Sequence, residues 1–205
     1  MTPLLITDRA ALGPLKATWK SGQEPFRNVG TPASFTLLEF WRWSASDLVN
    51  NTTRGVLAEF IVARALGVPT SCSREAWDSY DLLTPGGTRV EVKSAAYIQS
   101  WGQPKLSAIQ FVVPQRRGFD RNTGAMEAAA SRHADVYVFA LLAHQVKATI
   151  DPLDLDQWRF WVVATRVLNE RTRSQHSITL HSLEKLAGPS VAFNDLADAV
   201  TRVAG

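Results

Sequence analysis

The segment from Tyr80 to Lys93 constrains the fold most, because its pattern predicts two short strands joined by a tight turn. A Pro-Gly-Gly sequence at positions 85–87 interrupts two runs of alternating residues, which is typical of a β-hairpin. Side chains alternate between the two faces of a strand. The second strand is therefore expected to place the charged side chains of Arg89, Glu91 and Lys93 on one face. The intervening valines, Val90 and Val92, would lie on the other face.

The length of the turn decides where Asp81 lies. A three-residue turn, Pro85–Gly87, places Asp81 opposite Glu91, and directly opposed residues have Cβ atoms roughly 5 Å apart. A two-residue turn, Gly86–Gly87, places Asp81 opposite Val92 and sends the acid to the apolar face. We predict the first register, because burying a carboxylate among apolar side chains is costly.

Two carboxylates held side by side repel each other unless a cation or a proton lies between them. Oxygen ligands on a rigid hairpin suit Mg²⁺, which commonly binds one or two carboxylates and completes its shell with water and phosphate. Lys93 offsets one of the charges and is suited to stabilise negative charge at a phosphate. The hairpin therefore fits metal-assisted phosphodiester cleavage. The alternative is an ordinary charged surface, since Glu-x-Lys is common on strands.

The composition is that of a globular protein, and 205 residues suit one domain with a substantial core or one domain with a small appendage. The single Cys72 excludes an internal disulfide and a cysteine-rich zinc site. No basic-then-apolar leader is present, and the longest apolar run, Val136–Ala143, is far shorter than the roughly 20 residues of a membrane span. We therefore expect a cytoplasmic protein without a membrane span.

The net charge of +3 and the isoelectric point near 9.2 permit a polyanionic partner without requiring one. Clustered arginines commonly contact the phosphates of nucleic acid. Four arginines bracket one glycine-containing loop and are candidate contacts of this kind: Arg116, Arg117, Arg121 and Arg132. A solvated loop is the alternative interpretation.

The first part of the chain is predicted to contain an arm and a helix. Residues 1–34 are interrupted by prolines and glycines, which indicates an irregular arm. The aromatic segment Phe35–Trp43 is expected in the core or against a neighbouring helix, with base stacking as the alternative. Asn50–Gly67 has the pattern of a capped helix that ends at its glycine. Glu59 lies among apolar residues of this helix, so its carboxylate needs an arginine partner or points into a site.

The remaining chain alternates between strand and helix patterns, with the apolar run 136–142 expected in the centre of a sheet. Further strands are predicted at 108–113, 160–164 and 177–180. Helices or turns are predicted at 94–103, 125–132, 165–173, 182–188 and 194–203.

The order of these features resembles the PD-(D/E)xK nuclease superfamily, which has the restriction-endonuclease-like fold. That family has a helix with an inward Glu, an Asp-bearing strand, a hairpin, and a strand that ends in Glu-x-Lys. The matching residues here are Glu59, Asp81, Glu91 and Lys93. Tyr80 stands where the family often has Pro. Asp78 is an alternative for the aspartate, but its odd offset from Asp81 directs it to the other face of a regular strand.

The resemblance implies a set of metal ligands and catalytic groups. Mg²⁺, which Mn²⁺ can replace, would be bound by Asp81, Glu91 and the backbone carbonyl of Val92. Lys93 would orient or activate water and stabilise charge on the phosphate. Glu59 would bind a second metal or steer the water and Lys93. Three carboxylates and one ammonium leave a local charge of about −2, which one divalent ion cancels.

We therefore expect a single α/β (α+β) domain over residues 35–205, with a mixed central sheet flanked by helices, after an N-terminal arm over residues 1–34. Its expected activity is magnesium-dependent endonucleolytic cleavage of DNA, in restriction, repair or phage defence. A non-catalytic nucleic-acid-binding or assembly module with the same fold is one alternative, and an unrelated α/β domain is another. A homodimer is compatible with cutting both strands, although no interface stripe is evident in the sequence.

Overall fold

The central element of the protein is a four-stranded mixed sheet with the strand order β3-β4-β8-β9. A computed structural model describes residues 14–15, 17–71, 79–120, 122–172 and 174–205. The strands of the sheet are Leu82–Leu83, Arg89–Ala96, Val136–Leu142 and Trp158–Ala164. Strand β4 pairs antiparallel with β3 and parallel with β8, and β9 pairs antiparallel with β8. The predicted α+β class with a mixed central sheet is confirmed.

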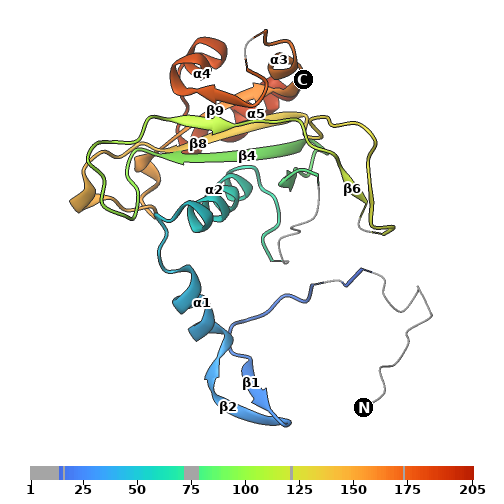
Figure 1. Cartoon of the computed structure of the whole chain (residues 1–205), viewed down its shortest axis with the longest axis vertical. Coiled ribbons are helices and arrows are strands. Elements are labelled where there is room, and N and C mark those ends of the chain that lie inside the picture. Colours follow the sequence, from blue (N-terminus) through green and yellow to red (C-terminus); the bar gives the residue numbers. More distant parts are fainter. Residues whose placement is uncertain (1–13, 16, 72–78, 121, 173) are drawn as a thin grey trace.

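Helices cover both sides of this sheet (Figure 1). Helix α2, Asn51–Ala65, lies along one side, and α3, Thr165–Asn169, and α4, Leu180–Ala187, lie on the other. Helix α5, Leu196–Ala204, packs against β9. None of the helices among the described residues combines the length and the apolar character that crossing a membrane requires.

Short elements connect the sheet and the helices. Strands β5, Gln110–Val112, and β10, Ser177–Thr179, pair antiparallel with each other. Strands β6, Phe119–Asp120, and β7, Ala125–Met126, form a small hairpin. The described residues also contain three 3₁₀ turns: Lys147–Thr149, Leu155–Gln157 and Phe193–Asp195.

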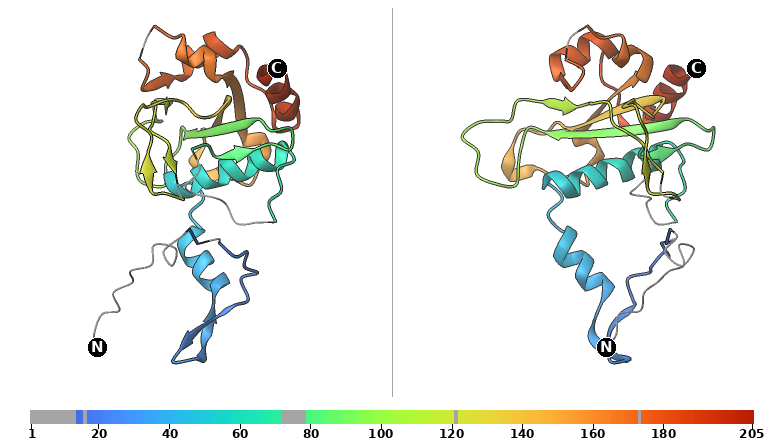
Figure 2. Two further views of the ribbon diagram at one scale, coloured as in Figure 1. Left: turned by 90° about the vertical axis from the view of Figure 1, so that its right-hand side faces the viewer. Right: turned by 45° about the vertical axis from the view of Figure 1, so that its right-hand side comes forward.

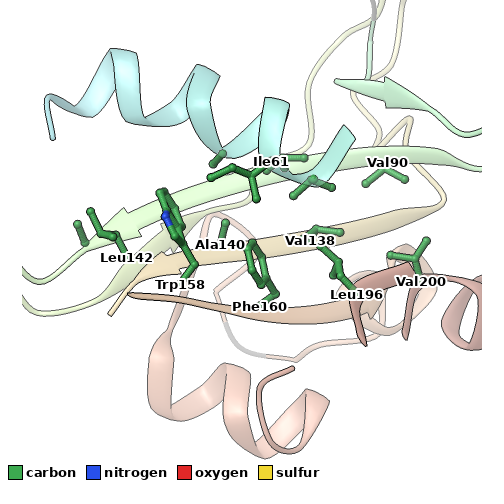
Figure 3. Packing of buried hydrophobic residues seen from close by; sticks show 13 residues of the cluster. Ile61, Val90, Val138, Ala140, Leu142, Trp158, Phe160, Leu196 and Val200 are labelled. Atoms are coloured by element: carbon green, nitrogen blue, oxygen red, sulfur yellow. The ribbon is translucent and has the colours of Figure 1, made fainter. Parts of the chain in front are cut away.

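The alternation of side chains along β8 divides the core into two apolar clusters. Val138, Ala140 and Leu142 belong to a cluster that also takes side chains from α2, β9 and α5 (Figure 3). Tyr137 and Phe139 belong to a second cluster, with side chains from β5, β10, α3 and α4. All seven residues of β8 are buried. This strand is therefore covered on both faces, as its continuous apolar sequence predicts.

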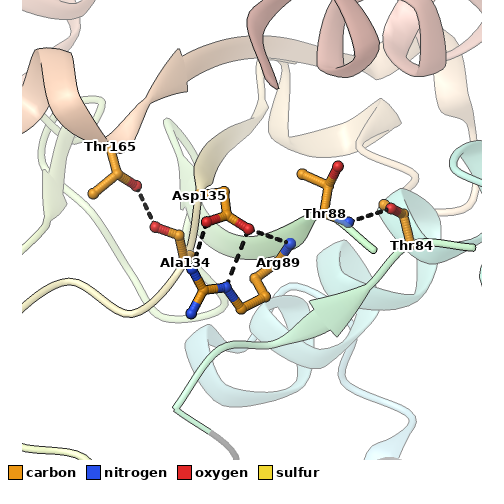
Figure 4. Close-up of polar contacts among 6 residues, drawn as sticks. All are labelled: Thr84, Thr88, Arg89, Ala134, Asp135 and Thr165. Carbon is orange, nitrogen blue, oxygen red and sulfur yellow. Dashed lines mark hydrogen bonds and ion pairs between the residues drawn. The ribbon is translucent and has the colours of Figure 1, made fainter. Parts of the chain in front are cut away.

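The parallel register of β4 and β8 is fixed by a charged pair at the start of both strands. The carboxylate of Asp135 accepts hydrogen bonds from the backbone N–H of Arg89 at 2.9 Å and from its guanidinium at 2.6 and 3.1 Å (Figure 4). These bonds hold the pKa of Asp135 below its ordinary value. Thr165 donates to the carbonyl of Ala134 at 2.6 Å, so α3 is attached to the same point. These hydrogen bonds at Asp135 and Ala134 position β4, which carries the candidate site.

Two predicted helices are wrong. Strand β4 extends to Ala96, so the segment 94–103 begins as strand and continues without a helix. The alanine-rich segment 125–132 starts with β7 and continues as loop, because Ser131 pairs with Arg116 through two backbone hydrogen bonds of 2.9 Å. This tertiary pairing overrides the helical preference of alanine, which is a weak determinant on its own.

The aromatic segment near the N-terminus is also placed differently from the prediction. It belongs to a projecting unit made of β1, Pro25–Asn28, β2, Thr31–Thr36, and α1, Leu37–Ala45. Helix α1 buries none of its residues. Figure 2 shows this unit extending away from the central sheet. We call residues 19–45 the aromatic module, and its aromatic side chains are not part of the core.

Candidate functional site

The hairpin at the edge of the sheet has the predicted three-residue turn. The register pairs Leu82 with Val90, so continuing it outward sets Asp81 opposite Glu91. The turn is closed by hydrogen bonds between Thr84 and the residues after it, including Thr88 N–H to the Thr84 hydroxyl at 3.0 Å. Gly87 adopts φ +85°, a conformation that favours glycine. The prediction of this register is confirmed.

Beyond the end of β3, the carboxylate of Asp81 accepts a backbone hydrogen bond from β4 that a neighbouring strand would otherwise accept. Its Oδ2 accepts a hydrogen bond from the backbone N–H of Val92 at 2.7 Å. The carbonyl of Val90 accepts a hydrogen bond from the Asp81 N–H, on the β3 side of β4. The carbonyl of Arg89 accepts from the Asp135 N–H, on the β8 side. The even-numbered residues of β4 therefore direct their backbone groups towards β3. Because the N–H and C=O of one strand residue point to the same side, the Val92 carbonyl faces the edge where Asp81 lies.

Glu91 and Lys93 form an ion pair on one face of β4. The ammonium of Lys93 donates to Glu91 Oε1, and the two side chains are only 21% and 16% exposed for Lys93 and Glu91 respectively. Burial raises the pKa of Glu91, and the nearby carboxylate of Asp81 raises it further, against the opposing effects of Lys93 and Arg116. The charged form of Glu91 is therefore destabilised on balance, and an additional cation would relieve it.

Tyr137 is a neighbour of the site that sequence analysis did not identify. It pairs with Glu91 in the parallel register of β4 and β8, and it is 3% exposed. Burial and the charge of Glu91 raise the pKa of its phenol to about 12. The phenol therefore stays protonated and can act only as a neutral group beside the carboxylates. No local sequence signal identifies it, because its position depends on pairing between distant strands.

Glu59 lies on α2, half-buried, and α2 packs against the side of β4 that carries Val90 and Val92. Glu91 and Lys93 project from the opposite face, where the second apolar cluster begins. The structure thus brings Asp81, Glu91 and Lys93 into one group, and it places Glu59 on the helix beneath it. The part assigned to Glu59 in a shared site stays a prediction.

The same helix joins β4 through a buried arginine. Arg54 is 4% exposed, and its guanidinium donates to the hydroxyl of Ser94, the carbonyl of Val49 and the side chain of Asn51. Burial lowers the pKa of Arg54. These contacts fix the beginning of α2 under the strand that carries Lys93.

The four candidate arginines have different surroundings. Arg116 and Arg117 are exposed, and the positive charge of Arg116 makes a small contribution that lowers the pKa of both Glu91 and Tyr137. Arg121 lies outside the described residues.

Arg132 has a structural position instead of a surface one. It is 8% exposed, and its guanidinium donates five hydrogen bonds, to the carbonyl of Val113, to Asn169 and to Gln175. These bonds use all of its N–H groups, so Arg132 anchors the loop and has no donor left for a phosphate. Asp78, the alternative aspartate, and Cys72 lie outside the described residues.

The donor set is suited to a small, oxygen-coordinated ion with open positions. Over the described ranges, no three His, Cys, Asp or Glu side chains cluster as metal ligands. The site offers two carboxylates and one backbone carbonyl that faces the same edge, from Asp81, Glu91 and Val92. Mg²⁺ commonly binds one or two carboxylates and keeps several waters, so the residues fit it better than a metal that needs a closed cage.

Comparison with known protein families identifies the chain. No curated protein matches it. The family model described as bacteriophage T4 endonuclease IV matches residues 35–182, which is more than half of the 205 residues. The matched region includes α2, the whole central sheet and each of Glu59, Asp81, Glu91 and Lys93. The chain therefore belongs to the bacteriophage T4 endonuclease IV family.

Proposed function

We propose that this protein is a metal-dependent endonuclease of the PD-(D/E)xK type, which hydrolyses phosphodiester bonds in DNA. The observation that carries the proposal is the grouping of Asp81, Glu91 and Lys93 at one strand edge. The family match adds that the chain belongs with an endonuclease. Hydrolysis requires that water attacks phosphorus, that a P–O bond breaks, and that the departing oxygen receives a proton.

The proposed cofactor is Mg²⁺, with Mn²⁺ as a substitute, held by Asp81, Glu91 and the carbonyl of Val92. A bound divalent ion would supply Lewis-acid activation of water and shielding of the phosphate charge. Asp81 is already fixed by the Val92 N–H, which leaves its second carboxylate oxygen as the ligand. Glu91 is consistent with this assignment, because burial and then the neighbouring carboxylate of Asp81 raise its pKa, and a bound cation would offset both effects.

Lys93 is the proposed catalytic cation. Its ammonium has three N–H donors, and the contact with Glu91 uses one of them. The remaining donors are suited to hold the attacking water and a phosphate oxygen. The partial burial of Lys93 strengthens these interactions, because charge–charge attraction is larger away from bulk water. Glu59, on the helix that packs against the opposite face of β4, is not part of this proposed step.

Calorimetric titration with Mn²⁺, run beside a plasmid-nicking assay with Mg²⁺, tests the metal site. Wild-type protein is expected to bind Mn²⁺ and to nick supercoiled DNA, and chelation with EDTA should stop nicking. Asp81→Asn keeps an oxygen acceptor for the Val92 N–H but removes the charge. We expect it to weaken Mn²⁺ binding by at least about tenfold. Mutating residues that only hydrogen-bond to a metal ligand already lowers metal affinity by about that factor.

Asp198→Asn, on the exposed surface of α5, is the matched control and should bind Mn²⁺ like wild type. Equal Mn²⁺ affinity in the two variants would place the metal elsewhere. DNA affinity that is insensitive to chelator, without any nicking, would favour the non-catalytic binding module.

Arg116 is proposed to contact the DNA phosphate nearest to the site, with Arg117 as a more distant contact. Arg116→Ala should reduce the nicking rate roughly ten- to hundredfold, which is the worth of one charge-assisted contact. Arg117→Ala removes the same charge from the adjacent exposed residue, whose side chain points to the other side of the extended segment that pairs with Ser131. It should therefore reduce DNA affinity with a much smaller effect on the rate. Equal rate losses in the two variants would contradict the special position of Arg116.

A further inference from the structure

The aromatic module carries a concentration of exposed apolar side chains that is unusual for a protein surface. Seven large apolar residues of residues 19–45 are between 38% and 98% exposed: Trp19, Phe26, Val29, Phe35, Phe40, Trp41 and Trp43. Single exposed apolar residues are ordinary, but a contiguous group of them commonly marks an interaction surface.

The module has a defined conformation although it has almost no core. The Leu38 N–H donates to the carbonyl of Gly22 at 2.8 Å, and Glu39 closes a capping box with Thr36 at the start of α1. Gly22 adopts φ +92°, and a Cβ there would lie 3.0 Å from the ring of Trp41. A two-stranded hairpin is marginally stable alone, so this arrangement is expected to gain stability from a cover.

Among the described residues, the central sheet and its helices do not provide this cover, because the module projects away from them (Figures 1 and 2). Its rings are arranged in two pairs. Phe26 and Phe35 have centroids 4.8 Å apart on the hairpin, and Phe40 and Trp43 have centroids 6.5 Å apart on α1. Residues three apart on a helix share a face, so α1 presents an aromatic stripe.

The charges of the module favour a protein partner over nucleic acid. The described part contains three cations, Lys20, Arg27 and Arg42, and two acids, Glu24 and Glu39, so it is close to neutral. Binding to a polyanion depends on concentrated positive charge. Protein interfaces, in contrast, are enriched in aromatic residues and depleted of charge at their centre.

We propose that a second copy of this chain covers the aromatic module, with the two modules forming a symmetric interface. An aromatic side chain buries about 150–250 Å² when fully covered. The six aromatic side chains, which are about half-exposed on average, offer on the order of 600 Å² in each copy, or about 1,200 Å² in the pair, which lies at the lower end of the range of stable interfaces. A twofold arrangement requires the same patch on both subunits, and a single module supplies it.

Sedimentation velocity of the full chain, without DNA or metal, tests this proposal independently of nuclease activity. Wild-type protein should have the mass of a dimer at micromolar concentration. Trp43 is 84% exposed, so Trp43→Glu should leave the fold intact and raise the dimer dissociation constant at least about 30-fold, as expected for a central aromatic contact. Phe40→Ala should weaken the dimer in the same direction.

Trp101→Glu is the matched control, because Trp101 is an exposed tryptophan outside the module, at 53% exposure. It should leave the dimer unchanged. A monomeric wild type at tens of micromolar would overturn the proposal, and so would a dimer that is insensitive to both module variants. Unchanged mass together with weakened DNA binding by Trp43→Glu would assign the module to nucleic acid instead.

Discussion

Replacing Lys93 with alanine is expected to reduce DNA nicking by roughly 100- to 1,000-fold, the effect of removing one fixed donor to a developing negative charge. The variant should keep its fold, because Lys93 is partly exposed and packs in neither apolar cluster. Circular dichroism and thermal unfolding verify the fold, and the initial rate of plasmid nicking measures the effect. Lys105→Ala removes an exposed lysine from a loop and is the control that should nick normally.

Metal binding distinguishes a catalytic Lys93 from a structural one. Lys93→Ala removes a cation that is paired with Glu91, so Mn²⁺ affinity should stay the same or increase. If Lys93 only held the carboxylates in position, Lys93→Ala would instead lower both the Mn²⁺ affinity and the nicking activity. Nicking that persists in both Lys93→Ala and Lys93→Met would place the chemistry at another site.

The largest expected loss of stability follows from replacing Trp158 with alanine. Trp158 is fully buried, stacks on Phe160 with centroids 6.4 Å apart, and donates from its indole N–H to the carbonyl of Pro152 at 3.0 Å (Figure 3). Large-to-small changes of buried aromatic residues cost about 3–5 kcal/mol. Urea unfolding should therefore show a free energy of unfolding lower by that amount.

The control for this prediction is Trp43→Ala, which removes the same side chain from an exposed position. It should change the stability of the monomer by less than about 1 kcal/mol. A loss below about 1 kcal/mol for Trp158→Ala would mean that the cluster around β9 does not hold the fold together.

The sequence predicts the hairpin well because the determinants are local. The Pro85–Gly87 turn and the alternation around it fix the register, and the register fixes the relation of Asp81 to Glu91. The central position of β8 follows from its continuous apolar sequence. The end of α2 at Ala65, two residues before Gly67 with φ +67°, follows from the same kind of local rule.

Features that depend on distant contacts could not be predicted. Tyr137 joins the site only because β4 pairs with β8, more than 40 residues further along the chain. The sequence around Arg132 suggests an exposed loop residue. Its hydrogen-bond partners, however, come from segments near Val113 and Gln175. The exposure of α1 was not predictable because its amphipathic sequence is equally suited to a core and to a partner.

The contact between Asp81 and the Val92 N–H has a consequence for solubility. Beyond the end of β3, none of the described strands pairs with this edge of β4, and open edges allow strands of other molecules to add to a sheet. The carboxylate occupies the Val92 donor and brings negative charge to this edge. Replacing Asp81, for which we propose metal binding, with a small apolar residue is therefore also expected to expose the Val92 N–H to a strand of another molecule.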